Sequence, residues 1–271
     1  MKKTHIVIPI GVAAPGTPIP QLLIKSIDSI LNQTNKDYIL TVAADTNISD
    51  EAKQILKDKN VDVKWFEPHS FFAKGGIWKK ISDCWREMDS EYVAFLHYDD
   101  LWHPEKLSEQ IKDIESNNLN GSWSEVYVMN ANDDVISPDY ANWQHFSSGT
   151  VGSKTTAFAH SVIVKKNEFF NCGITKYDEK WSSCFEDLFA IFLHKIGNMH
   201  KTLNAKFYWR SHDMNMSSTL CLWTQPNSMW KDAVEKQMGE TGYPSHNVDT
   251  DYHFIMGEMR NEIHQIALKY S

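Results

Sequence analysis

The residues EYVAFLHYDD, at positions 91–100, decide the fold of this chain of 271 residues. Tyr92–Leu96 is a short apolar run, typical of a buried strand, and it leads into two adjacent carboxylates, Asp99 and Asp100. Two buried charges are costly unless something positive meets them. Two interpretations are open. Either acid could cap a helix that begins near Pro104, or the pair could hold a divalent cation that carries a diphosphate.

Strand and helix patterns alternate along the chain before this stretch. β-rich runs at 5–10, 38–43 and 61–66 are separated by helical apolar spacing at 19–31, 50–59 and 77–88. This order predicts an α/β domain with a mostly parallel central sheet and helices on both faces. Ligands of such sheets bind beyond the carboxyl ends of the strands. That rule predicts that the ligand lies next to the Gly/Pro loop at 11–20, Asp45 and residues 97–100.

The pattern becomes less regular after Asp100. We predict one domain over residues 1–215, with a nucleotide-binding half at 1–100 and an acceptor half at 101–215. Within the second half, helices are expected at 104–116 and 185–196 and a strand at 123–130. Residues 216–271, rich in Met, Trp and His, are expected to form a small C-terminal extension with a helix at 254–268.

Composition narrows the classes of partner and compartment. The chain has 27 basic and 35 acidic residues without a basic stripe, so duplex nucleic acid is not an expected partner. No apolar run reaches the about 18 residues of a membrane-spanning helix, and the run at 6–10 is too short for a signal sequence. The scattered cysteines are expected to be reduced thiols. We therefore expect the protein in the cytoplasm.

Two further acidic positions each allow a structural and a functional interpretation. Glu186 and Asp187 open the helix predicted at 185–196, where the helix dipole favours acidic residues. Alternatively, one of them is a general base that accepts a proton from an acceptor hydroxyl. Asp45 either caps the turn after its strand or accepts a hydrogen bond from a base or ribose.

Two residues near position 210 also have open roles. Arg210 is either a phosphate clamp or an ordinary surface cation. His212 is either a metal ligand or diphosphate contact, or a polar surface residue. The histidines form no H-E-x-x-H pattern, so a zinc protease is not supported.

Several segments, in this order, resemble the family 2 glycosyltransferases, which adopt the glycosyltransferase-A fold, a Rossmann-like architecture. SIDSILNQT at 26–34 is close to that family's first-helix signature, S-I-x-S-I-L-x-Q-T. The other matching segments are Ala43–Asp45 at the nucleotide-contacting acid, 91–107 around the D-x-D motif, 173–187 around the catalytic base, and 208–212 at an aromatic-R-x-H motif. The match covers roughly residues 4–215.

The resemblance implies an inverting transfer of a sugar from a nucleoside diphosphate sugar, most often UDP-linked, to a hydroxyl group. The implied acceptor is a glycan or lipid-linked oligosaccharide of bacterial surface polysaccharide synthesis. With such an acceptor, the protein is also expected to contact the inner face of the cell membrane peripherally. Asp187 would be the catalytic base and Glu186 would orient it. Asp99 and His212 would hold Mn²⁺ or Mg²⁺. The implied contacts to the nucleotide sugar are Pro9, Ile10, Asp45, Lys80, Tyr98, Asp99 and Arg210.

Three positions depart from the family pattern. His97 replaces the first acid of D-x-D, Ala44 replaces the usual Asp before Asp45, and 81–82 lacks the usual Arg-Asn pair although Lys80 is adjacent. These departures keep a second hypothesis open, a catalytically silent module that binds sugar nucleotides or glycans. A third, a sugar nucleotidyltransferase, is disfavoured because the loop at 13–18 has prolines where glycines and a basic residue would grip a triphosphate.

Overall fold

The computed structural model of the chain describes residues 4–11, 18–68, 76–137, 159–173, 193 and 195–211. The strands are β1 (Thr4–Ile10), β2 (Tyr38–Asp45), β3 (Asp62–Phe66), β4 (Tyr92–Phe95), β5 (Leu101–Trp102), β6 (Gly121–Met129), β7 (Val135–Ser137), β8 (Val162–Lys165) and β9 (Met199–Arg210). The helices are α1 (Ile19–Leu31), α2 (Asp50–Asp58), α3 (Gly76–Glu87), α4 (Lys106–Ser116) and α5 (Lys166–Asn171), with a short 3₁₀ helix, η2, at Ala159–Ser161.

These strands form one sheet in the order β3-β2-β1-β4-β8-β6-β9-β5, and β7 pairs with β6. The first four are parallel neighbours, as predicted. Strands β8, β7 and β5 are antiparallel to their partners, so all the others run in one direction. The prediction of a mostly parallel α/β sheet is confirmed. The strand order reverses at β1, and such a switch point is where α/β sheets bind ligands.

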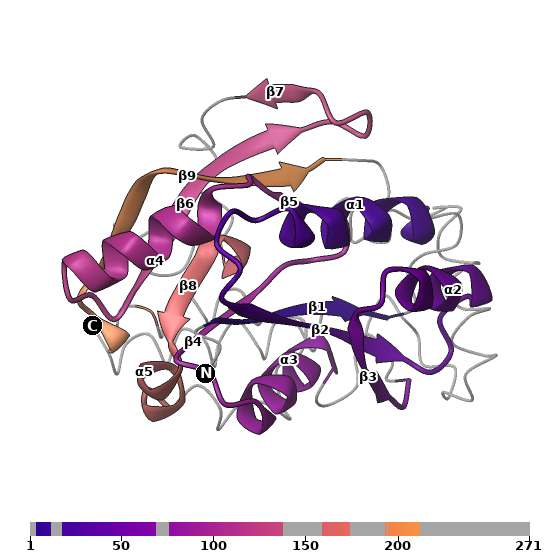
Figure 1. The fold of residues 1–271 in the computed structure, drawn as a ribbon, viewed down its shortest axis with the longest axis horizontal. Helices are drawn as coiled ribbons and strands as arrows, with labels where there is room; N and C mark the ends of the chain where they lie inside the picture. Colours follow the sequence, from indigo (N-terminus) through magenta and orange to yellow (C-terminus); the bar gives the residue numbers. More distant parts are fainter. Residues whose placement is uncertain are drawn as a thin grey trace, which may run out of the picture.

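Helices cover both faces of the sheet, as Figure 1 shows. One face packs on α1, α2 and α4 through buried aliphatic side chains that include Leu23, Leu56 and Ile111. The other packs on α3 and α5, where Trp85 meets Trp78 and Phe169 edge to face. Successive residues of β1 point alternately into the two cores, as a strand buried on both faces requires.

The boundaries of the predicted elements that the structure describes agree with the sequence pattern to within a few residues, whereas β5, β7, β8, β9 and α5 were not predicted. Helix α2 is capped by Ser49, whose hydroxyl accepts a hydrogen bond from the Ala52 amide, so Asp50 lies in the first turn. Helix α4 begins at Lys106 with Glu105 at its N-cap. Of the predicted helix at 185–196, residues 193, 195 and 196 are described, and these are helical. The boundary at 215/216, the extension 216–271 and its helix lie outside the described residues.

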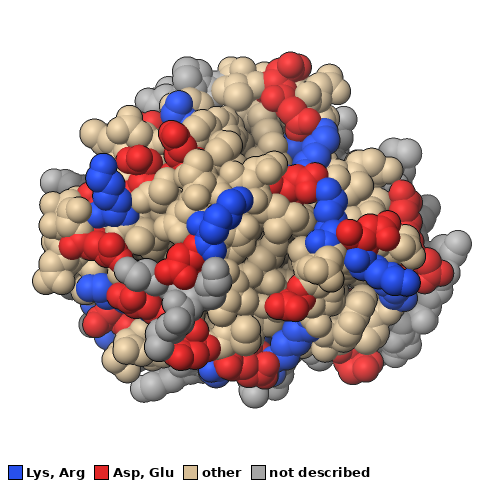
Figure 2. Space-filling model, viewed as in Figure 1, with Lys and Arg blue, Asp and Glu red and all other residues tan. Residues whose placement is uncertain are grey.

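The surface carries charges of both signs. Figure 2 shows Lys and Arg side chains interspersed with Asp and Glu on one face of the molecule. Among the described helices, none has the length and apolar character needed to cross a membrane.

Candidate active site

The carboxyl ends of β1, β2 and β4 meet at one edge of the sheet, and the polar residues singled out in the sequence gather there. Gly11 follows β1, Asp45 ends β2, and residues 97–100 follow β4. A Cβ at Gly11 would lie 2.9 Å from Asp45 Oδ2, so a larger residue at this position would displace the Asp45 carboxylate.

Asp45 forms a buried ion pair with Lys80 of α3. Both side chains are almost inaccessible to solvent. Burial lowers the pKa of Lys80, and the charge of Asp45 opposes that shift. Two of the predicted nucleotide contacts, Asp45 and Lys80, thus form an ion pair with each other. Pro9 and Ile10 lie next to this pair, buried in β1 opposite Ala43 and Ala44.

Asp100 is buried and has a defined partner for each carboxylate oxygen. Oδ1 accepts a hydrogen bond of 3.0 Å from the backbone amide of Arg210, and Oδ2 lies 3.0 Å from Nδ1 of His160. Burial and the nearby charge of Asp99 raise the pKa of Asp100 to about 6, although His160 and Arg210 oppose the shift. Because α4 begins only at Lys106, neither acid caps a helix, and that interpretation of the sequence is wrong.

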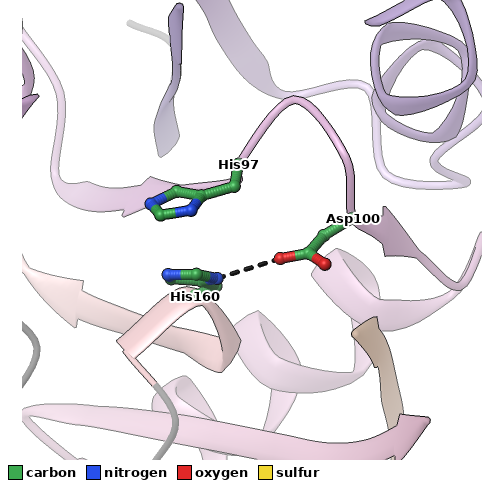
Figure 3. A group of neighbouring side chains, drawn as sticks. All are labelled: His97, Asp100 and His160. Atoms are coloured by element: carbon green, nitrogen blue, oxygen red, sulfur yellow. Dashed lines mark hydrogen bonds and ion pairs between the residues drawn. The ribbon is translucent and has the colours of Figure 1, made fainter. Parts of the chain in front are cut away.

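His160, from η2, was not identified in the sequence. Its imidazole lies against that of His97, with ring centroids 3.7 Å apart and ring planes tilted by 36°, and Figure 3 shows one ring above the other with Asp100 beside them. Potential ligand atoms of His97, Asp100 and His160 all lie within 4.8 Å of one another. The sequence did contain a signal for this residue: His160 lies inside the apolar run 157–164, and a buried imidazole needs a polar partner.

The guanidinium of Arg210 is turned into the protein. Its Nε donates 2.8 Å to the backbone oxygen of Asp99, and Nη1 donates to the backbone oxygen of Asn130 and pairs with the Asp133 carboxylate. Asp133 also pairs with Lys25 of α1 at 2.5 Å. Arg210 is fully buried, so it is not the surface cation considered as one alternative. In this geometry it holds the loop that carries Asp99, and contact with a diphosphate stays a prediction.

Helix α1 supports the same loop from the other side through the polar residues of its sequence signature. The hydroxyl of Ser26 donates to the backbone oxygen of His97 at 3.0 Å. The hydroxyl of Ser29 accepts from the backbone amide of Trp102 at 3.2 Å. The serines of the signature therefore fix the beginning and the middle of the segment between β4 and α4.

The glutamine and threonine of the signature fix the end of that segment. Gln33 is fully buried; its amide nitrogen donates to the oxygen of His103 at 2.8 Å, and its side-chain oxygen accepts from Leu107 at 2.9 Å. The backbone amide of Thr34 donates to the oxygen of Pro104 at 2.8 Å. The polar residues Ser26, Ser29, Gln33 and Thr34 of the signature thus support the segment that carries Asp99 and Asp100, a role that the apolar spacing does not disclose.

Asp99 and Tyr98 remain half-buried at the rim of the site. Burial and the two neighbouring aspartates raise the pKa of the Tyr98 phenol above its usual value, so it stays a neutral hydrogen-bonding group. The predicted base Asp187, its neighbour Glu186 and the predicted metal ligand His212 lie outside the described residues. Their roles stay predictions.

Known proteins resemble this chain over parts of its length. A glycosyltransferase of Methanocaldococcus jannaschii, itself uncharacterized, is 29% identical over 118 residues, 41% of this chain and 39% of the relative. The Escherichia coli UDP-Glc:alpha-D-GlcNAc-diphosphoundecaprenol beta-1,3-glucosyltransferase WfgD is 24% identical over 123 residues, 45% of this chain and 47% of the relative. The matched region therefore spans less than half of each relative.

Solved structures share the fold at low identity. Residues 1–349 of Staphylococcus aureus TarS, in complex with UDP-GlcNAc, superpose with a TM-score of 0.55 at 13% identity, over 94% of this chain and 71% of that one. The profile of glycosyl transferase family 2 matches residues 17–177, which include α1, Asp45, Lys80 and the loop after β4. The chain belongs to glycosyl transferase family 2.

Proposed function

We propose that this protein is an inverting glycosyltransferase that moves a sugar from a nucleoside diphosphate sugar, UDP-linked, to a hydroxyl of a glycan or lipid-linked oligosaccharide. The observation that carries the proposal is the convergence of Asp45, Lys80 and the Asp99–Asp100 loop at the switch point of a family 2 sheet. WfgD, a relative, is named for a UDP-glucose donor and a lipid-diphosphate acceptor, and TarS is solved with UDP-GlcNAc. Both support a UDP-linked donor, and the name of WfgD supports the acceptor class.

The nucleotide end of the donor is proposed to lie over β1 and β2. Asp45 offers a carboxylate and Lys80 an ammonium group, so the pair presents an acceptor beside a donor to a base or ribose. The backbone of Pro9 and Ile10 and the phenol of Tyr98 would flank it. Because Asp45 and Lys80 already bind each other, a nucleotide that contacts Asp45 must share that carboxylate with the lysine.

The diphosphate is proposed to lie at Asp99, the half-buried acid of the loop. The residues fit a hard cation there. Asp99 is a carboxylate at the rim of the site, and its charge raises the pKa of buried Asp100, so the loop carries negative charge. Asp99, with His212, would hold Mn²⁺ or Mg²⁺, which when bound supplies positive charge where the leaving diphosphate becomes more negative. Arg210 holds the backbone oxygen of Asp99, and α1 holds the same loop at the backbone oxygen of His97.

The acceptor chemistry is assigned to Asp187. An ionised carboxylate within hydrogen-bond reach of the acceptor hydroxyl can take its proton while the oxygen attacks the anomeric carbon, on the face opposite the leaving group. Glu186 would orient Asp187 or the acceptor. A lipid-linked acceptor would bring the enzyme to the inner face of the cell membrane, in surface polysaccharide synthesis.

The test is a screen of nucleotide sugars with Mn²⁺, in which release of nucleoside diphosphate and product stereochemistry are measured with and without a lipid-diphosphate glycan acceptor. The proposal expects release only from UDP-sugars, stimulated by acceptor, with an inverted anomeric configuration. Binding of UDP-sugars without any turnover, in the presence of acceptor, would instead favour the silent binding module.

A further inference from the structure

We propose that His97, Asp100 and His160 form a binding site for a borderline divalent transition-metal ion, of which Zn²⁺ is the type, separate from the hard-cation position at Asp99. The site binds its ion without nucleotide, so the proposal goes beyond the glycosyltransferase function and does not depend on it. Of the described residues, these three are the group whose potential ligand atoms cluster closely enough to share an ion.

The donor set selects the class of ion. Two imidazoles and one carboxylate provide nitrogen and oxygen ligands, which suit Zn²⁺ and its transition-metal neighbours, whereas Mg²⁺ prefers oxygen ligands and retained waters. Three protein ligands also leave the fourth position of a tetrahedral ion open. Asp99 is not a member of the group.

Binding of an ion to all three residues requires one ligand to move. Ligand atoms about 2.0–2.1 Å from a tetrahedral ion lie about 3.3 Å from one another. His160 Nδ1 and Asp100 Oδ2 are already 3.0 Å apart, and all three ligand atoms lie within 4.8 Å. The adjustment falls on His97, whose half-buried ring lies on the more open side of the group and must tilt out of its stack with His160.

Neighbouring groups hold the other two ligands, Asp100 and His160, in place. The Arg210 amide holds Oδ1 of Asp100, which leaves Oδ2 directed at His160. The rings of Phe95 and Phe207 lie edge to face against His160, at centroid distances of 5.0 and 5.9 Å. Outer partners that orient ligands and exclude water in this way strengthen metal sites.

The experiment is a titration of the nucleotide-free full chain with Zn²⁺, followed by calorimetry, and with Co²⁺, whose visible absorption reports the ligands bound. H97A removes a ligand at a half-buried position, and H160N removes one while keeping a polar group for Asp100. Each is expected to weaken one Zn²⁺-binding event by at least about tenfold and to abolish the corresponding Co²⁺ absorption. H200A is the matched control, because His200 is an exposed histidine that also pairs with an aspartate, Asp113, and its loss should leave this event intact.

A second control separates this site from the proposed function. Asp99→Asn should retain the Zn²⁺ event while losing Mn²⁺-dependent UDP binding. If folded H97A and H160N both bind Zn²⁺ and Co²⁺ as the wild type does, the three residues are a hydrogen-bonded part of the core and the proposal is overturned. If the Zn²⁺ event occurs but UDP does not bind under any condition, the metal site stands and the donor assignment fails.

Discussion

Replacement of Gln33 by alanine tests whether the α1 signature supports the active-site loop. Gln33 is fully buried just after α1, and it bonds to His103, in the segment between β4 and α4, and to Leu107, in the first turn of α4. Its amide nitrogen also donates to the oxygen of Ser29 at 2.9 Å. We expect the Q33A variant to lose about 2–4 kcal/mol of unfolding free energy.

The magnitude follows from the partners left behind. Leu107 lies in the first turn of α4, where its amide has no intrahelical acceptor, and the loss of Gln33 leaves that buried donor unsatisfied at a cost of about 1–3 kcal/mol. The oxygen of His103 still accepts a bond from the Lys106 amide at 2.9 Å, so the loss of its bond from Gln33 costs less, about 1 kcal/mol.

Urea unfolding of the purified chain measures this loss, and Q54A is the matched control. Gln54 makes one exposed bond to Asp58 within α2, so its removal should change the unfolding free energy by at most about 0.5 kcal/mol. Because the supported loop carries Asp99, Mn²⁺-dependent UDP affinity should fall in Q33A and not in Q54A. A stability for Q33A as close to wild type as that of Q54A would refute the supporting role of the signature.

Three further predictions concern charge. Asp99→Asn should abolish Mn²⁺-dependent UDP binding, measured by calorimetry, while thermal unfolding stays near wild type; UDP bound as tightly as before would remove Asp99 from the site. Asp187→Asn should lower sugar transfer by roughly 10²–10⁴-fold with donor affinity preserved, and nearly full transfer would shift the base to Glu186. Burial, with Lys166 and Lys64, lowers the pKa of His5 from 6.5 to about 4. As the pH falls, His5 is protonated in the unfolded chain before it is protonated in the folded one, so the free energy of unfolding should decrease by up to roughly 3 kcal/mol from pH 6.5 to 4. Urea unfolding at several pH values should show a smaller decrease in His5→Asn.

The order of elements and the edge that carries the site could be predicted from the sequence because both depend on local patterns. Apolar periodicity distinguishes β1 to β4 from the helices between them, and parallel strands necessarily bring their carboxyl ends to one edge. Position alone therefore singled out Asp45 and residues 97–100, whereas the choice of Asp99 as the metal ligand came from the family resemblance and stays a prediction. Lys80 was named only through the resemblance, as a cation next to the missing Arg-Asn pair, since its ion pair with Asp45 depends on how α3 packs.

The contacts that complete the site depend on pairings distant in sequence, and no local pattern encodes them. His160 reaches Asp100 because β8 inserts antiparallel next to β4. The two interpretations of Arg210 offered by the sequence, a phosphate clamp and a surface cation, both placed its guanidinium outside the core. Its buried position follows from the pairing of β9 with β6 and β5, which brings it beneath the loop.

The dependence of the loop on β9 has a consequence for biosynthesis. Asp100 and the Arg210 amide are separated by 110 positions, and β5 pairs only with β9 among the described strands. During translation the signature of α1 and the carboxylates of the loop leave the ribosome long before the strand that fixes them. Contacts of such high sequence separation form late, because the loop-closure entropy must be overcome before they contribute. A nascent chain stalled ahead of Met199 would therefore hold strands β1 to β4 with the loop unfinished, and the proposed donor binding would arise only as β9 docks.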